Sequence, residues 1–445
     1  MNLTKQLTDD DIKRIVAEKN ISFIRLQFVD ILGQMKNVAI TATELERVLK
    51  HGMVFDGSSV EGFVRIEESD MFLRPDPSTF AILPWYADHG IARMICDVYR
   101  PDGTPFEGDS RQILRRAVND AKALGYDFHV GPECEFYLFQ CDSQGRPTTN
   151  THDEAGYFDL APTDSGELAR IDMVKTLIDL GFKIEAAHHE NGPGQHEIDF
   201  KYSDALSAAD NIITFKLAVK VIAKKYGLHA TFMPKPLGDK CGNGMHCNMS
   251  LFANGTNAFF DPDGINGLSK EAYWFMGGLM KHAKGMCAIT NPLVNSYKRL
   301  VPGYEAPVYI AWSMANRSPL VRVPVARGQG TRLELRNPDP SCNPYLALAV
   351  MLQCGLEGIR KQIDPPPPVD SNIYNMTAED LKSKGVEKIP VNLNMAIDAL
   401  MKDEPIKQAL GSHVLESFLR AKRIEWADYS GAVHPWEIER YLKLY

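Results

Sequence analysis

The chain of 445 residues lacks any apolar run long enough to cross a bilayer. Its first 14 residues are polar and acidic, whereas a secretory signal needs a basic start and an apolar stretch. The eight cysteines contain no C-x-x-C pair, so the sequence has no pattern for a zinc ribbon or a dithiol redox site. We therefore expect a cytosolic protein with reduced thiols and no membrane partner.

A basic excess is also missing, because 57 acidic residues outnumber 49 basic ones and leave a net charge of -8. Nucleic acids usually require a basic surface, so we expect no nucleic-acid partner. The sequence contains neither a G-x-x-x-x-G-K-[ST] phosphate loop nor a complete G-x-G-x-x-G fingerprint. If the protein uses ATP, it binds the nucleotide in another way.

The 44% hydrophobic content supports a large core, and the length suggests two domains. An expected strand over residues 92–99 is followed by the breaker-rich segment 100–105, which is the best candidate boundary. We predict an N-terminal domain over residues 1–104 and a catalytic domain over residues 105–445.

Local patterns predict the elements within these domains. Residues 20–40 have the alternation of two short strands, and Thr43 is expected to cap a short helix that ends near Gly52. Helical patterns over residues 110–124 and 208–225 alternate with strand-like runs, which favours a layered α+β or α/β domain.

Four segments carry charged, amide or imidazole groups at alternating positions, which places these groups on one face of a strand. The segments are residues 131–136, 190–197, 244–250 and 332–336. Taken singly, each is more typical of a wet strand face, a cross-strand ion pair or a surface turn. Together they would gather five carboxylates and one imidazole: Glu133, Glu135, Glu190, Glu197, Glu334 and His246.

Five clustered carboxylates repel one another unless cations neutralise them. Oxygen ligands with one imidazole suit Mg²⁺ or Mn²⁺ better than a tight zinc site. Positive charge also recurs further along the chain, at Arg299, Arg317, Arg322, Arg332 and Arg336. Metals combined with arginines are what phosphoryl transfer requires, although a lone arginine of this kind is usually a surface residue.

Along essentially the whole chain, the motifs resemble those of class I glutamine synthetases. The resemblance is carried by residues 55–59, 131–136, 188–197, 235–236, 243–250, 295–306 and 316–337. It implies an α+β fold with an N-terminal β-grasp domain and a larger domain whose curved antiparallel sheet forms half of an active-site barrel. The neighbouring subunit would complete that barrel, in a dodecamer of two hexameric rings.

The resemblance also implies roles by motif position. Ligands of the metal beside glutamate would be Glu135, Glu190 and Glu197, and those of the metal beside the ATP phosphates Glu133, His246 and Glu334. Glutamate and the transferred phosphate would contact Gly242, Arg299, Glu305, Arg317 and Arg336. The nucleotide would contact Glu185, Tyr202, Asn248, Ser250 and Arg322, with Arg317 and Arg332 as further phosphate ligands.

Three more positions have family counterparts. Asp56 stands at the ammonium site, on a loop that reaches the adjacent subunit, and Glu305 stands on a flap that would close over the intermediate. Arg65 stands where the feedback-inhibited alpha branch senses glutamine. The short connection between Phe139 and Tyr157 also indicates that branch.

Two features of the sequence differ from patterns found in the family. Cys241 replaces the usual asparagine before the histidine strand, and Asn243 is a candidate substitute for the missing glutamate contact. The flanks of Tyr374 differ from those of the adenylylated branch, which disfavours that modification.

The implied activity is the condensation of glutamate with ammonia through γ-glutamyl phosphate, using ATP and at least two Mg²⁺ or Mn²⁺ ions. A sister ligase that joins glutamate to a polyamine or another amine, a two-metal hydrolase and an inactive structural or regulatory relative stay open. Asp56 together with Glu305 favours ammonium, and the six candidate ligands favour an active enzyme. A transcription regulator is a further candidate partner.

Overall fold

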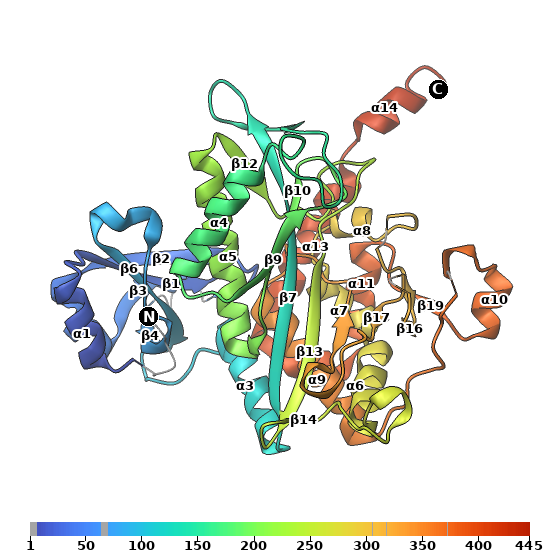
Figure 1. Cartoon of the computed structure of the whole chain (residues 1–445), viewed down its shortest axis with the longest axis horizontal. Coiled ribbons are helices and arrows are strands. Elements are labelled where there is room, and N and C mark those ends of the chain that lie inside the picture. The colour runs from blue at the N-terminus through green and yellow to red at the C-terminus, as the bar shows by residue number, and fades with distance from the viewer. Residues whose placement is uncertain (1–6, 64–69, 305, 317, 372) are drawn as a thin grey trace.

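The computed structural model describes residues 7–63, 70–304, 306–316, 318–371 and 373–445. In Figure 1 a smaller N-terminal domain (blue) lies beside a larger domain that holds the rest of the chain. Within the described residues, no helix combines the length and the apolar character needed to cross a membrane.

Over its described residues, the N-terminal domain is a six-stranded sheet with two α-helices. Its elements are α1 (Asp9–Glu18), β1 (Phe23–Val29), β2 (Met35–Thr41), α2 (Leu45–His51), β3 (Met53–Asp56), β4 (Asp70–Pro75), β5 (Ala81–Ile82) and β6 (Ile91–Tyr99). The strand order is β2-β1-β6-β4-β3, with β5 on β6, and β1 runs parallel to β6. The two strands expected over residues 20–40 are confirmed as β1 and β2.

The cap predicted for the first-domain helix was wrong. Thr43 lies inside a 3-10 turn, Ala42–Glu44, and α2 begins only at Leu45, after Glu44, which makes no side-chain capping hydrogen bond. The predicted end is confirmed, because Gly52 follows the helix with a φ of 76°, a conformation that glycine adopts without strain.

The larger domain alternates helices with strands. Its helices are α3 (Ser110–Ala123), α4 (Glu167–Asp179), α5 (Ala205–Lys225), α6 (Lys270–Lys281), α7 (Ala283–Thr290), α8 (Ser296–Arg299), α9 (Pro344–Lys361), α10 (Ala378–Ser383), α11 (Leu393–Met401), α12 (Glu404–Leu410), α13 (Ser412–Gly431) and α14 (Pro435–Tyr441). The helix expected over residues 208–225 begins three residues early, because the Asp204 side chain caps it by accepting from the backbone N of Ser207.

One large sheet organises this domain. Its strands are β7 (Asp127–Cys141), β8 (Pro147–Thr151), β9 (Ile184–His189), β10 (Gln195–Phe200), β11 (Ser203–Asp204), β12 (Leu228–Thr231), β13 (Met245–Ala253), β14 (Thr256–Asn257), β16 (Trp312–Ser313), β17 (Val321–Arg322) and β18 (Leu333–Leu335). The main order is β16-β17-β18-β13-β7-β10-β9, and only the β16–β17 pair is parallel among these described strands. A separate pair joins β15 (Tyr309–Ile310) to β19 (Glu387–Lys388).

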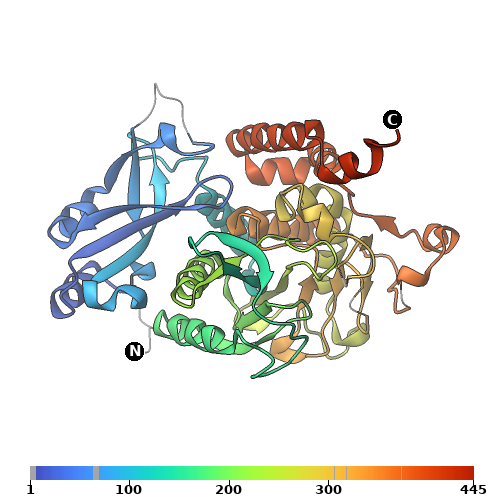
Figure 2. The same cartoon turned by 90° about the horizontal axis from the view of Figure 1, so that it is seen from above.

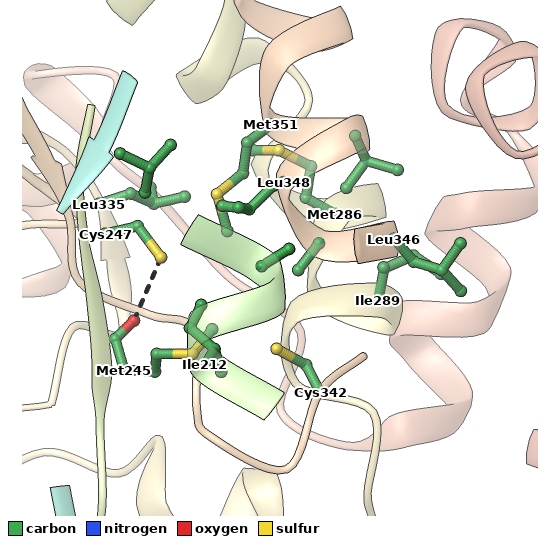
Figure 3. Packing of buried hydrophobic residues seen from close by; sticks show 14 of the residues in the cluster. Ile212, Met245, Cys247, Met286, Ile289, Leu335, Cys342, Leu346, Leu348 and Met351 are labelled. Atoms are coloured by element: carbon green, nitrogen blue, oxygen red, sulfur yellow. Dashed lines mark hydrogen bonds between the residues drawn. The ribbon is translucent and has the colours of Figure 1, made fainter. Parts of the chain in front are cut away.

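The core lies between one face of this sheet and the helices behind it. Figure 3 shows Met245 and Cys247 of β13 beside Ile212 of α5 and Leu348 of α9. These four side chains are buried in one apolar cluster, so the sheet has one dry face. The expected α+β architecture with a curved sheet is confirmed.

The last helix, α14, contributes no buried residue to the core. In Figure 1, α14 projects away from the body, and Figure 2 shows the C-terminal helices (red) gathered on one side of the larger domain. No residue of α14 is buried, and its Trp436 is 59% exposed.

Candidate active site

Strand pairing gathers the predicted polar residues on the second face of the large sheet. His246 of β13 lies opposite Glu133 of β7, and Glu197 of β10 lies opposite Glu135 of β7. Opposed residues of paired strands share a face, so these side chains converge over the sheet. At the next pair of strands, Asn248 of β13 lies opposite Glu334 of β18.

The convergent side chains line a cavity of about 310 Å³. The predicted residues around it are Glu133, Glu135, Glu190, Glu197, Gly242, His246, Arg299, Arg322, Glu334 and Arg336. A second cavity of about 420 Å³ is lined by the predicted nucleotide residues Glu185, Tyr202, Asn248, Ser250 and Arg332. Glu133 and Asp199 border both cavities, so the two spaces meet at these carboxylates.

The cluster offers ligand sets with metal-like spacing. In the groups Glu133–His246–Glu334, Glu135–Glu197–His246 and His188–Glu197–Asp199, the ligand atoms of each group lie within 4.8 Å of one another. The first group is one of the two predicted sets. Glu190 lines the same cavity, but it joins no such group among the described residues.

The electrostatics of the cluster show that it needs positive charge. Burial, with the charges of Glu135 and Asp199, raises the pKa of Glu197 well above its usual range. Burial and the charge of Glu133 raise the pKa of Asp199 to about 7. One oxygen of each, Oε1 of Glu197 and Oδ1 of Asp199, is buried without a hydrogen-bond partner in the described chain. Buried acceptors of this kind are costly unless a cation or a proton serves them.

Glu133 shows the opposite behaviour. Burial acts to raise its pKa, but hydrogen bonding and positive charge from His246 outweigh that effect and lower the pKa to about 2. Its Oε1 accepts a hydrogen bond from the Asn248 amide at 2.8 Å, and the Asn248 Oδ1 accepts from Nε of Arg332 at 2.9 Å. This chain of contacts links the carboxylate cluster to the second cavity.

Two arginines pair with Glu334, which lines the first cavity. Nη1 of Arg322 lies 2.7 Å from Oε2 of Glu334, and Arg336 pairs with Oε1 of the same carboxylate. Arg299 is buried and donates to the carbonyl of Asn337 at 2.7 Å and to that of Arg336 at 3.1 Å. The guanidinium groups are therefore held by the protein before any substrate is present.

Asn243 does not fit the role of a substitute for the missing asparagine. It is completely buried, its Nδ2 donates to the carbonyl of Met233 at 2.9 Å, and its Oδ1 accepts from Gln195 at 3.1 Å. Both ends of the amide are occupied, whereas Cys241 and Gly242 line the first cavity.

One predicted residue, Asp56, lies apart from the two cavities, and three others lie outside the described residues. Asp56 is exposed at the end of β3 in the N-terminal domain, accepts hydrogen bonds from Ser58, and lines neither cavity. Glu305, Arg317 and Arg65 lie outside the described residues.

A second acidic and imidazole cluster lies behind the turn that carries Glu190. Its members are His152, Asp153, Asp164 and His196. Nη1 of Arg170 lies 2.6 Å from Asp164 and 2.8 Å from Nδ1 of His196. Because an arginine can only donate, the neutral His196 carries its proton on Nε2, which disqualifies that atom as a metal ligand. The cluster is therefore a buried ion-pair network.

Several lining residues escaped the sequence prediction: Tyr157, His188, Gln195, Asp199 and Tyr304. Asp199 continues the alternation of Glu197 by two positions, and His188 precedes Glu190 by two, so the same period could have found both. Tyr157 and Tyr304 come from loops, where no periodic pattern exists.

Comparison with known proteins adds to this geometry. The glutamine synthetase β-grasp domain matches residues 20–101, and the glutamine synthetase catalytic domain matches residues 107–441. The glutamine synthetase of Clostridium saccharobutylicum is 60% identical over 439 residues, which cover 98% of this chain and 99% of the relative. That of Staphylococcus aureus strain MW2 is 55% identical over 443 residues, 99% of each chain.

Solved structures show the same likeness. A structure described as a GmaS/ADP complex is 35% identical, has a TM-score of 0.88, and is matched over 97% of this chain and 99% of its own. A cryo-EM structure of Plasmodium falciparum glutamine synthetase is 25% identical with a TM-score of 0.88, over 99% and 100% of the two chains. The chain therefore belongs to the glutamine synthetase family, and its activity is that of a glutamate–ammonia ligase that uses ATP and divalent metal ions.

Proposed function

We propose that the two cavities are the two halves of one active site, with glutamate and metals in the first and ATP in the second. The observation that carries this proposal is the shared wall formed by Glu133 and Asp199, which brings both spaces to one carboxylate cluster. ATP in the second cavity would direct its phosphates to that wall. Tyr202, which is 55% exposed, offers an aromatic surface for the base.

The cluster fits divalent metal ions. Its buried carboxylates with raised pKa values and unpartnered oxygens are the donor set that Mg²⁺ or Mn²⁺ prefers. Glu135, Glu190 and Glu197 would hold one ion, and Glu133, His246 and Glu334 a second. Bound there, the ions neutralise the phosphates during phosphoryl transfer.

The protein groups have distinct tasks in this proposal. Arg336, Arg322 and Arg332 counter negative charge as the γ-phosphoryl group moves to the glutamate side chain. Arg299 and Gly242 form the wall against which glutamate binds, and Arg317 assists phosphate. Asn248, Ser250 and Glu185 contact the nucleotide.

Two acidic residues would act on the second half-reaction. Asp56 binds ammonium and takes a proton from it, because a carboxylate favours the cation and can accept its proton. Glu305 closes over γ-glutamyl phosphate and excludes water that would otherwise hydrolyse it.

The family resemblance also supports an assembly of twelve subunits in two rings, with Asp56 lent to the site of the next subunit, and a cytosolic location. The exposure of Asp56 and its separation from both cavities of its own chain favour such sharing. Glutamine sensing at Arg65, a boundary at residue 104 and a transcription regulator as partner belong to the same proposal.

The test is complementation between two inactive variants. Asp56→Ala and Glu334→Ala subunits are unfolded, mixed equally and reassembled, and glutamine formation is measured. A working site needs a Glu334-intact subunit beside an Asp56-intact neighbour, so random assembly should return about a quarter of wild-type activity. Activity near zero in mixed oligomers verified by mass would show that Asp56 acts in its own subunit.

A second assay defines the second substrate. ADP release is measured with glutamate and Mg²⁺, with and without ammonia, and beside a panel of polyamines. A rate of ADP release that rises with ammonia and does not change with the amines supports the proposed roles of Asp56 and Glu305. Faster turnover with an amine would favour the sister ligase.

A further inference from the structure

Gln195 is a fully buried residue that neither the chemistry of the cluster nor the family motifs assign a role. It is the first residue of β10, two positions before Glu197 and four before Asp199. The alternation of the strand places its side chain on the same face as these two carboxylates. It also lines the first cavity.

The side-chain amide of Gln195 contacts three separate segments. Its Oε1 accepts from the backbone N of Gly192 at 3.0 Å. Its Nε2 faces the Oε2 of Glu135 at 3.2 Å, the carbonyl of Gly242 at 3.1 Å and the Oδ1 of Asn243 at 3.1 Å. All three groups around Nε2 are acceptors, so a reversed amide would place oxygen against oxygen, and the orientation is defined.

The contact with Glu135 determines how that carboxylate is turned. The Oε2 of Glu135 accepts from Gln195 and also from the backbone N of Gly244 at 2.8 Å. Its other oxygen, Oε1, lies 3.9 Å from the Nε2 of His246. One oxygen is thus held by the protein, and the other faces the centre of the ligand cluster.

The contact with Gly242 holds a loop that has no regular structure of its own. Residues 241–244 connect to the sheet through Gln195 and through the Tyr137 hydroxyl, which donates to the carbonyl of Cys241 at 2.7 Å. At Gly242, an added Cβ would lie 2.4 Å from the carbonyl of Pro234, so the backbone of the loop passes too close to Pro234 for any larger residue. Gln195 therefore connects Glu135, a candidate metal ligand, to Gly242, a candidate contact of the substrate glutamate.

We infer that Gln195 is a positioning residue that holds both Glu135 and the backbone of Gly242 with one amide. It thereby sets the distance between the metal ion at Glu135 and the substrate glutamate at Gly242. The inference rests on the proposed roles of Glu135 and Gly242. Partners of this kind behind metal ligands typically change metal affinity or activity by about 10- to 100-fold when they are removed.

Gln195→Met tests the inference, because it keeps the length and volume of the side chain and removes its hydrogen bonds. We expect the Kd for Mn²⁺, measured by calorimetry without turnover, and the KM for glutamate each to rise about tenfold or more. The KM for ATP should stay within about twofold, because Gln195 does not line the second cavity.

Asn343→Leu is the matched control. Asn343 is also a buried amide between two segments, contacting the carbonyls of Asp30 and Ile31, and it lines neither cavity. It should lower the Tm and leave both constants unchanged. A Gln195→Met enzyme with a lower Tm but wild-type Mn²⁺ and glutamate constants would reduce Gln195 to a structural residue and overturn the inference.

Glu135→Ala, measured in parallel, separates this outcome from failure of the site itself. If Glu135→Ala loses Mn²⁺ and Gln195→Met does not, only the role of Gln195 is lost. If neither variant changes Mn²⁺ binding, the assignment of Glu135 is lost with it. If Gln195→Met does not assemble, Gln195→Asn replaces it, since its amide is one methylene too short for these contacts and should give the same shifts.

Discussion

The two faces of strand β13 differ in what they contact, although their residues alternate along one segment. His246, Asn248 and Ser250 face the two cavities. Met245, Cys247 and Met249 are completely buried against the helices. One strand therefore carries chemistry and core packing at a separation of a single residue. Function and stability are thus divided by face, and substitutions on each face should have different consequences.

The polar face bears an electrostatic cost that the dry face does not. On the dry face, apolar burial favours folding. On the polar face, burial and mutual repulsion raise the pKa values of Glu135, Glu197 and Asp199, so the folded chain bears a cost that metal ions would offset.

The largest expected effect is on the polar face. Glu133→Gln keeps the shape of the side chain and removes its charge, and we expect kcat/KM to fall about a thousandfold, which corresponds to the several kcal/mol of a metal-centred interaction. Without metal the Tm should change little, because the lost attraction between Glu133 and His246 opposes the relief of repulsion on Glu197 and Asp199. Thermal melting and steady-state kinetics check both parts.

The exposed Glu18 of α1 provides the control for this variant. Glu18→Gln changes the same charge on a helix surface and should leave activity and Tm unchanged. An activity loss under tenfold in Glu133→Gln, or a clear drop in its metal-free Tm, would contradict the division between the faces.

On the dry face, Met249→Ala should mainly affect stability. Removing this completely buried side chain should cost about 2–5 kcal/mol, because the surrounding core collapses only partly. The KM values of the folded enzyme should stay near those of the wild type. Met249→Leu, which conserves volume, should cost less than about 1.5 kcal/mol. A changed glutamate KM with an unchanged Tm would contradict the division between the faces.

The stabilisation that metal ions give to the polar face should depend on pH. The folded pKa of Asp199 is about 7, above its ordinary value, so its contribution to stability is complete below about pH 4 and is lost as the pH rises through 7. Glu197, whose pKa is also raised, acts in the same direction. The increase in Tm produced by Mn²⁺ over EDTA should therefore grow between pH 5.5 and 8. An increase that does not vary with pH would contradict the raised pKa values.

The smallest expected effect distinguishes the ATP part of the polar face from the glutamate part. Ser250→Ala should raise the KM for ATP about two- to tenfold, the range for one neutral hydrogen bond, and leave the KM for glutamate unchanged. Ser250 lines the second cavity and not the first. Equal changes in both constants would mean that the two cavities do not act separately. Cys247→Ala changes a residue on the opposite, buried face of the same strand, and this control should alter neither constant.

Much of this arrangement could be predicted from the order of residues. Alternation placed His246 and Asn248 on one face and Met245 and Cys247 on the other, since side chains of a strand point to opposite sides whatever the partner. Helices α3 and α5 followed from their apolar periodicity. The cap at Thr43 failed because local propensity alone does not decide where a 3-10 turn gives way to a helix.

The site could be predicted only in part. Glu133, Glu334 and His246 were brought together as expected, but Asp199 and His188 were missed although they share the same period. The same period also places Gln195 on this face, but its role was missed, because a glutamine shows its role only when its partners on other segments are known.

The sequence by itself determined which side chains share a face and which chemistry they can support, because both depend on residue type and spacing. Only the tertiary structure decided that Glu133 lies opposite His246 and Glu197 opposite Glu135, since register follows from packing across strands distant in sequence. It alone also decided that these carboxylates are buried together, and burial with mutual repulsion is the reason that the pKa values of Glu197 and Asp199 rise.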